Sequence, residues 1–207
     1  MKKKISPNRM ELFRLRKRLV LAQRWHKLLK DKLEGLVREL QDTMGRYKEL
    51  RQRFDEEFPR VLARFTLAKA VSPEGAVAEA VQQNASTAEL EVGSRPVMGV
   101  SVPVFKPPPP PERFRYSLTQ TPPELDVAFA ELRKLPDLLF ELAQTERTLC
   151  LLAHELERTR RRTNALEYVV VPELQESRAD IEQKINEAER SNTSRLMKIK
   201  DMLMVGR

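Results

Sequence analysis

The sequence predicts an all-α fold: a long antiparallel two-helix coiled coil formed by the N- and C-terminal helices, with a small, mostly irregular insert that contains a short β-hairpin. Apolar residues recur at alternating steps of three and four over residues 7–70 and 124–204, which is the repeat of a coiled-coil seam. Ten of the fourteen prolines lie between Pro73 and Pro123. Aromatic residues make up only 6% and charged residues 33% of the chain, so a thick globular core is not expected. We therefore divide the chain into an N-terminal helix (1–70), an insert (71–123) and a C-terminal helix (124–207).

The first helix is expected to begin at Ser6-Pro7, because serine caps free N–H groups and proline suits the first helical position. Its predicted seam consists of Leu12, Leu15, Leu19, Ala22, His26, Leu29, Leu33, Leu36, Leu40, Thr43, Tyr47, Leu50, Phe54, Phe58, Val61, Phe65 and Ala68. The step from Phe54 to Phe58 is four where three is due, and Pro59 removes a hydrogen bond. A bend is expected there.

In the insert, residues 76–83 are rich in alanine and predict two helical turns. Residues 88–92 and 97–105 alternate like strands, and a turn is expected at Gly93 to Pro96. Val100, Val102 and Val104 would then share one face of an edge-type hairpin. The prolines from 107 to 111 predict an extended polyproline spacer.

The second helix is expected from Glu124, with a kink or restart at Pro136 and a kink at Pro172. Its predicted seam consists of Leu125, Phe129, Leu132, Leu139, Leu142, Leu149, Leu152, Leu156, Thr163, Leu166, Val170, Leu174, Ile181, Ile185, Ala188, Leu196, Ile199 and Leu203. The second helix is the longer one, so unless it breaks at Pro136 about 17 residues, roughly 25 Å, should extend past its partner.

Charge is unevenly distributed along the chain. Residues 1–32 hold twelve Lys and Arg against two acids, whereas residues 124–157 hold three against eight. If the helices fold back on each other, the end with both termini is strongly basic. No signal peptide or apolar run long enough to span a membrane is present, so any link to a membrane should come through partners.

No catalytic, cofactor-binding or metal-binding constellation stands out in the sequence, and we expect none. The chain contains no phosphate-binding Gly-x-x-x-x-Gly-Lys-Ser/Thr motif. His26 falls on the seam and His154 lies near it, without a cluster of metal ligands beside either. Cys150 is the single cysteine, which excludes an internal disulfide and is interpreted as an inert packing or flanking residue in a reducing compartment.

Several motifs resemble one known family. They are Ser6 to Met10, Leu21 to Gln23, Leu28 to Lys30, Pro96 to Pro103, the stretch from Thr145-Glu146 through the block Arg161-Arg162-Thr163-Asn164-Ala165-Leu166-Glu167 to Val171-Pro172, and Arg195 to Lys200. Together they resemble the D subunit of the V/A-type proton- or sodium-translocating ATPases over essentially the full length. The Arg-Arg-x-Asn-Ala-Leu-Glu block is the most specific of them.

The resemblance implies a non-catalytic central rotor shaft on the cytoplasmic face of a membrane. Its implied partners are the alternating catalytic and non-catalytic hexamer of A and B subunits, a small stalk subunit, called F in this family, and a funnel-like subunit that couples the shaft to the membrane ring. The candidate contacts to the hexamer are Arg9, Arg14, Arg16, Arg18, Lys198 and Lys200. The candidate contacts to the side partner are Tyr47, Leu50, Phe54, Leu142, Leu149 and Leu152.

Two other functions are compatible with parts of the sequence. A basic helical arm is also typical of a nucleic-acid-binding or cytoskeletal coiled coil. Against nucleic acid as a partner, the basic residues lie beside a leucine seam, and Trp25 is the single tryptophan, so no aromatic stacking platform is evident. A nucleotide-hydrolysing enzyme in its own right has almost no support in the sequence.

Overall fold

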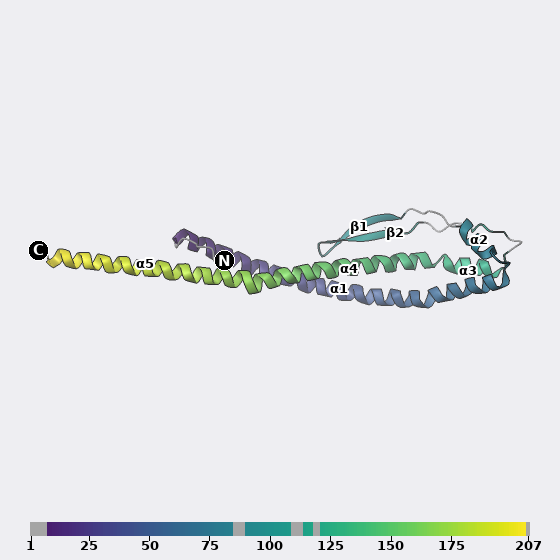
Figure 1. The fold of residues 1–207 in the computed structure, drawn as a ribbon, viewed down its shortest axis with the longest axis horizontal. Coiled ribbons are helices and arrows are strands. Elements are labelled where there is room, and N and C mark those ends of the chain that lie inside the picture. Colours follow the sequence, from purple (N-terminus) through teal and green to yellow (C-terminus); the bar gives the residue numbers. More distant parts are fainter. Residues whose placement is uncertain (1–7, 85–89, 109–113, 118–120, 206–207) are drawn as a thin grey trace. The chain divides into compact units, whose positions relative to one another are not determined.

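The computed structural model describes residues 8–84, 90–108, 114–117 and 121–205, and it is dominated by long helices (Figure 1). A long N-terminal helix, a small insert and a long C-terminal helical stretch follow one another, as the sequence predicts. The elements in chain order are α1 (Arg9–Val71), α2 (Ala76–Gln83), β1 (Glu91–Val97), β2 (Val100–Lys106), α3 (Glu124–Leu132), α4 (Leu135–Ala165), the π-helix η1 (Leu166–Val170) and α5 (Val171–Val205).

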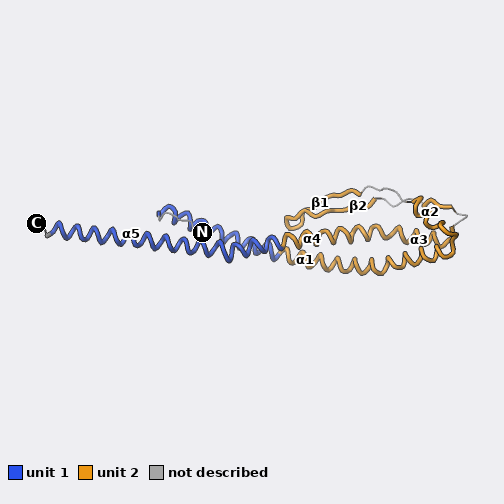
Figure 2. The backbone as a smooth tube through the Cα atoms, viewed as in Figure 1, with its two compact units in different colours: residues 1–34, 157–207 blue, residues 35–156 orange. Residues whose placement is uncertain are grey.

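The chain forms two compact units (Figure 2). Unit 1 comprises residues 1–34 and 157–207, and unit 2 comprises residues 35–156. In each unit a segment of α1 pairs with a segment of the C-terminal helices in the antiparallel direction. Ion pairs mark the pairing: Arg9 with Glu189 and Arg16 with Glu182 in unit 1, and Arg64 with Glu131 in unit 2.

The seam predicted for α1 is confirmed. Of its members only Phe58 is exposed, and all the others are buried or half-buried. Phe58 stacks on Phe54 with ring centroids 5.1 Å apart, so the four-residue step leaves one aromatic ring outside the seam. The helix continues through Pro59 without interruption. At the start of α1, the Asn8 side chain caps the helix by accepting a hydrogen bond from the Met10 N–H at 3.2 Å. The predicted start at Ser6-Pro7 lies outside the described residues.

The seam of α4 differs in part from the prediction. Leu139 is exposed, and Leu135 and Leu142 are buried on either side of it. Thr145 and Thr159 are also buried, and they fill the two gaps in the predicted seam. Each threonine hydroxyl of this kind can bond within its own helix: Thr145 donates to the Glu141 carbonyl at 2.7 Å. The seam of α4 therefore runs unbroken as Leu135, Leu138, Leu142, Thr145, Leu149, Leu152, Leu156, Thr159 and Thr163, and it continues at Leu166.

The irregularity expected at Pro172 takes the form of a π-helix. Pro172 has no N–H, and its ring would clash with the carbonyl of Tyr168, four residues earlier. The regular α-helical hydrogen-bond pattern is therefore interrupted at this carbonyl. The Val171 N–H bonds instead to the Leu166 carbonyl, five residues back. The extra residue shifts the seam by one: Val171 is half-buried and Val170 is exposed, contrary to the predicted seam.

The insert contains the predicted hairpin, but its turn lies elsewhere. β1 and β2 pair antiparallel from Glu91 with Lys106 to Val97 with Val100, which leaves Met98-Gly99 as a two-residue turn. Both turn residues have positive φ, 50° and 80°, as a type I′ turn requires. The expected turn residues Gly93 to Pro96 are inside β1. The helical turns predicted at residues 76–83 are present as α2.

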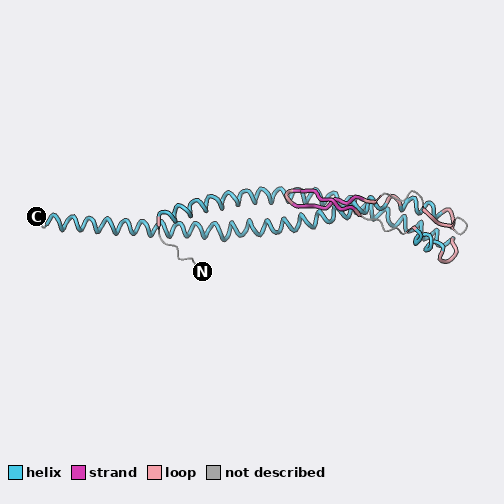
Figure 3. Tube along the Cα trace, turned by 90° about the horizontal axis from the view of Figure 1, so that it is seen from above, coloured by secondary structure: helices cyan, strands magenta, loops and turns pink. Residues whose placement is uncertain are grey.

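The hairpin lies against the helices of unit 2 through β2 (Figures 1 and 3). Val102 is buried, Val100 and Val104 are half-buried, and the Phe105 N–H donates to Gln144 Oε1 at 3.0 Å. The predicted valine face is thus the packed face. β1 is exposed along almost its whole length. Most of the predicted polyproline spacer, residues 107–111, lies outside the described residues.

An aromatic cluster joins α1, α2 and α3 in unit 2. Ala68, Ala80, Leu125 and Phe129 are buried, and the rings of Phe65, Phe114 and Tyr116 lie around the Phe129 ring at centroid distances of 4.4–5.6 Å. Just beyond the cluster the helix breaks at Arg133 and Lys134, and α4 restarts with Pro136 as its second residue. This is the restart expected at Pro136, and proline suits it because the first helical turn needs no N–H donor.

Candidate functional site

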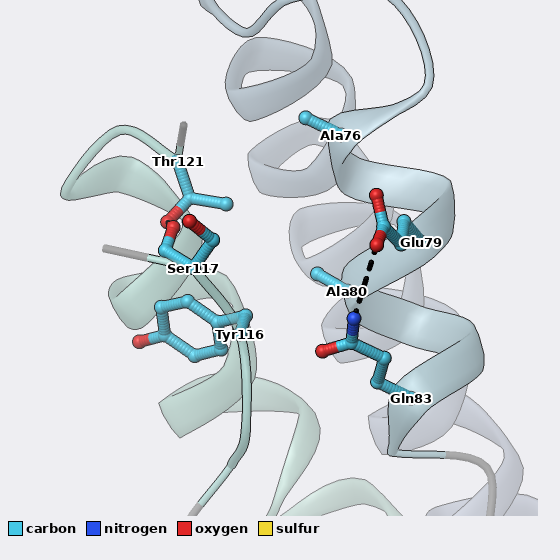
Figure 4. Close-up of a pocket in the computed structure, with 7 residues that line it drawn as sticks. All are labelled: Ala76, Glu79, Ala80, Gln83, Tyr116, Ser117 and Thr121. Atoms are coloured by element: carbon cyan, nitrogen blue, oxygen red, sulfur yellow. Dashed lines mark hydrogen bonds between the residues drawn. The ribbon is translucent and has the colours of Figure 1, made fainter. Parts of the chain in front are cut away.

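The described residues contain little that could bind a small ligand. No group of three or more His, Cys, Asp or Glu side chains in the described ranges converges in a way that could hold a metal ion. The best-formed hollow has a volume of about 20 Å³ and lies between α2 and the segment with Tyr116, Ser117 and Thr121 (Figure 4). It has room for about one water molecule. Gln83 donates a hydrogen bond to Glu79 beside it at 3.1 Å. The helix surfaces are therefore the places where a function is to be expected.

The flanks of the paired helices can be named by heptad position, a to g, with the seam at a and d. The a and d positions include Leu12 and Leu15 in α1, Leu142 and Thr145 in α4, and Val171 and Leu174 in α5. One flank then holds the e and b positions, and the other holds the g and c positions. In unit 1 the e flank carries cross-helix ion pairs. Arg16 bonds Glu182 at 2.8 Å, Arg9 bonds Glu189 at 2.5 Å, and His26 Nε2 lies 3.4 Å from a Glu167 carboxylate oxygen. The Glu189 carboxylate raises the pKa of Arg9, first through the hydrogen bond and then through its charge.

The four arginines predicted as hexamer contacts therefore differ in their surroundings. Arg9 and Arg16 are engaged with carboxylates of their own chain on the e flank. Arg14 pairs with Glu11 one turn away at 3.3 Å, and Arg18 is exposed on the opposite flank. Exposed pairs of this kind contribute little to stability, so a carboxylate on a partner could exchange with them. Whether these residues contact a partner stays a prediction.

The C-terminal part of α5 has no helix beside it in the described part of unit 1. Arg9, at the start of α1, lies level with Glu189, so α5 extends past it from Arg190 to Val205, by about 24 Å. The sequence predicts such an extension only for a second helix that does not break at Pro136. The helix does break there, yet an extension is present, and it lies at the C-terminal end. Every residue from 190 to 204 is exposed, including Lys198 and Lys200. The exposed apolar residues there are Leu196, Met197, Ile199, Met202, Leu203 and Met204. A helix end that stays in water does not usually expose so many large apolar side chains in so short a segment.

The two flanks of unit 2 also differ. The hairpin covers the g/c flank: β2 bonds to Gln144, and Met98 at the hairpin tip lies over Gly35. A Cβ on Gly35 would be only 2.4 Å from the Met98 ε-methyl group, so an alanine there would have to push the end of that flexible side chain aside. The g-position ion pair between Arg46 and Glu141 lies on the same flank.

The e flank of unit 2 is uncovered by the described part of the chain. Its e positions include Met44, Arg51 and the half-buried Val37 on α1 and Leu139, Glu146 and Ala153 on α4. Met44 and Leu139 are exposed apolar side chains. The pKa of Arg51 is raised, first by its hydrogen bond to Asp55 and then by the Asp55 charge, with smaller contributions from Tyr47 and Glu146.

The predicted side-partner residues lie in or at the seam rather than on an open face. Leu50, Leu142 and Leu152 are buried. Tyr47, Phe54 and Leu149 are half-buried, so each still exposes an edge. The prediction selects these residues because they are apolar, but the seam between the two helices also requires apolar residues. Apolar character alone therefore cannot separate partner contacts from seam residues. The exposed apolar residues beside the seam, Met44 and Leu139, are missing from that predicted set, although their e positions could have indicated them.

Among the described residues, no helix combines the length and the apolar character that crossing a membrane requires.

Comparison with known proteins identifies the family. The family model that matches residues 11–201 is described as the D subunit of ATP synthase. The chain is 41% identical over 205 residues to the V-type ATP synthase D subunit of Acetivibrio thermocellus, covering 97% of this chain and 92% of the relative. It is 39% identical over 204 residues to the corresponding V-type ATP synthase protein of Clostridium botulinum strain Alaska E43, covering 96% of both chains. The corresponding protein of C. botulinum strain Kyoto is 40% identical over 208 residues, 98% of this chain and 96% of the relative. With a family model and relatives that span nearly its whole length, the chain belongs to the family of ATP synthase D subunits.

Proposed function

We propose that this chain is the central rotor shaft of a V/A-type ion-translocating ATPase. It would couple ATP hydrolysis or synthesis in a hexamer of alternating catalytic and non-catalytic subunits to rotation of a ring in the membrane. Hydrolysis would push successive faces of the asymmetric shaft, and synthesis would reverse the sequence. The shaft itself would perform no chemistry. Family membership supports the complex, and the paired helices support a mechanical role, because a packed seam resists twisting better than a single helix.

The observation that carries the proposal is the extension of α5 beyond Glu189. Its apolar side chains have no partner helix at that level in the described part of the chain, yet exposed apolar surface of this extent is costly in water. Enclosure by the hexamer would bury it. Lys198 and Lys200 lie among these apolar residues and would meet carboxylates at the rim of such a sleeve. Charge interactions of this kind need no fixed register, which suits a turning surface.

The small F subunit would dock on the open e flank of unit 2. The hairpin occupies the other flank, and the e flank offers Met44 and Leu139 with an ion-paired rim around Arg51. The exposed edges of Tyr47, Phe54 and Leu149 would extend that contact. A funnel-like subunit would connect the shaft to the membrane ring. The chain would thus be peripheral to the membrane, on its cytoplasmic face.

Co-purification tests this function. A tagged chain recovered from native membranes in mild detergent should bring down both kinds of hexamer subunit, a small side subunit and the membrane ring. Removal of residues 196–205 should lower recovery of the hexamer while leaving the side subunit bound. If the tagged chain brought down nucleic acid or cytoskeletal filaments and no ATPase subunits, the alternative of a basic scaffold would replace this proposal.

A further inference from the structure

We propose that the shaft is gripped by the hexamer on one flank of unit 1, along a stripe formed by Leu21, Trp25 and Leu28. This inference rests on the proposed function and specifies the surface on which it acts. The partner we assign to the stripe is a segment of a hexamer subunit that presents apolar side chains edged by carboxylates.

The three residues form a continuous ridge rather than scattered surface positions. They are spaced by four and then three residues, so they occupy successive c, g and c positions on one side of α1. Their exposed fractions are 50%, 57% and 65%. An isolated exposed leucine is ordinary, but three large apolar side chains in line, with a tryptophan in the middle, have the composition of an interaction hot spot.

The other flank of unit 1 is different in kind. The e flank carries the ion pairs of Arg9, Arg16 and His26 with glutamates of the C-terminal helices. Two apolar residues, Phe13 and Val20, are exposed beside that flank, but they are seven residues apart, and the Lys17 ammonium lies 4.5 Å from the centre of the Phe13 ring. On α1 of unit 1, the cross-helix ion pairs thus lie on the e flank and the continuous apolar ridge lies on the other flank, and the ridge gains more from being covered.

Charge identifies the chemistry of the partner. Unit 1 holds 23 Lys and Arg against 12 Asp and Glu, a net charge of +11, whereas unit 2 holds 15 against 18. Arg14 and Arg18 continue the line of the stripe toward the N-terminus at c and g positions, so the apolar ridge is edged by cations. A surface with apolar side chains beside carboxylates would match both features. A single-sided grip also makes the shaft asymmetric, which a rotor pushed in sequence requires.

Cysteine protection in the assembled complex tests the stripe. Two variants are made in a Cys150→Ser background, Leu28→Cys on the stripe and Val20→Cys as a control on the other side of α1, and each is compared with its own rate in the free chain because Leu28 is 65% and Val20 47% exposed. Their reaction with a small maleimide is followed in the free chain and in the purified complex. We expect the Leu28→Cys reaction to slow by about tenfold or more on assembly, and the control to slow by clearly less. Equal protection at both positions, or none at Leu28→Cys, would overturn the single-sided grip.

A photoactivatable cross-linker on the Leu28→Cys side chain identifies the partner. The adduct should form with a hexamer subunit, in a peptide that contains both Asp or Glu and apolar residues. An adduct with the side subunit or the funnel-like subunit would refute the assignment. Failure of the chain to enter any ATPase complex would instead refute the proposed function, so the two failures are distinguishable.

Discussion

Leu152 tests the energetic role of the seam most sharply. Its side chain is 0% exposed in α4 of unit 2, and replacement by alanine removes three carbon atoms from that position. At about 0.8 kcal/mol per buried carbon this amounts to about 2.4 kcal/mol, to which a cavity term is added. A two-helix seam can collapse from its open flanks, so that term should be small. We expect Leu152→Ala to lower the free energy of unfolding by about 2–3 kcal/mol.

Urea denaturation followed by circular dichroism measures this loss. The denaturation midpoint should fall by about 1 M urea at a slope of about 2–3 kcal/mol per molar. The matched control is Leu139→Ala in the same helix, where the side chain is 48% exposed, and its cost should be about 1 kcal/mol or less. If Leu139→Ala cost as much as Leu152→Ala, the seam would not run where the structure has it.

Further predictions concern α1, the hairpin turn and Cys150. Gly35→Ala should displace the Met98 side chain, because the new Cβ would lie 2.4 Å from its ε-methyl group. The NMR resonance of the Met98 methyl group should shift as a result, and an unchanged resonance would argue against the contact. Gly45→Ala is the control: nothing lies within 4 Å of its new Cβ, so thermal unfolding should show stabilisation by about 0.5–1 kcal/mol. Gly99→Ala, at φ 80°, should destabilise the hairpin by about 1 kcal/mol, seen as faster amide exchange in β1 and β2 but not in α4; unchanged exchange would contradict the turn geometry. Cys150 is exposed beside the e flank of unit 2, between the e positions Glu146 and Ala153. Its thiol should react readily with maleimide in the free chain and slowly once the F subunit is bound; equal rates would place that partner elsewhere.

The seam of α1 can be predicted almost residue by residue because its periodicity is carried by leucine and aromatic side chains. The seam of α4 can be predicted less completely. Threonine is usually a surface residue, so apolar periodicity does not select Thr145 and Thr159, although both are buried. A hydroxyl is acceptable inside when it has a hydrogen-bond partner, and the Glu141 carbonyl is that partner for Thr145. Leu139 enters the predicted seam because an apolar residue near the right spacing cannot be distinguished from a neighbour one position off.

The one-residue shift of the seam at η1 cannot be predicted from periodicity. A proline predicts an irregularity, but whether the helix kinks, breaks or inserts a residue depends on packing against the partner helix. The predicted hairpin turn is wrong for a related reason: Gly93 and Pro96 have the composition of a turn, whereas Met98 needs tertiary support to hold a positive φ. The contact of Met98 with Gly35, far away in the sequence, is of that kind.

The partner-binding surfaces are the hardest features to predict. Apolar character indicates seam and surface residues alike, so the predicted side-partner set falls largely on buried positions such as Leu50 and Leu142. Likewise, positive charge selects Arg9 and Arg16 as candidate contacts to the hexamer. The sequence does not reveal that each has a carboxylate of its own chain beside it. Only three-dimensional pairing separates the residues that hold the chain together from those left for partners.

Rotation itself is the most direct test of the rotor assignment. A Cys150→Ser chain carrying Arg95→Cys on the exposed strand β1 can be labelled with a bead and assembled into a complex whose hexamer is fixed to a surface. On addition of ATP the bead should turn in one direction relative to the hexamer. A complex that hydrolysed ATP and moved ions while the bead stayed still would contradict the assignment.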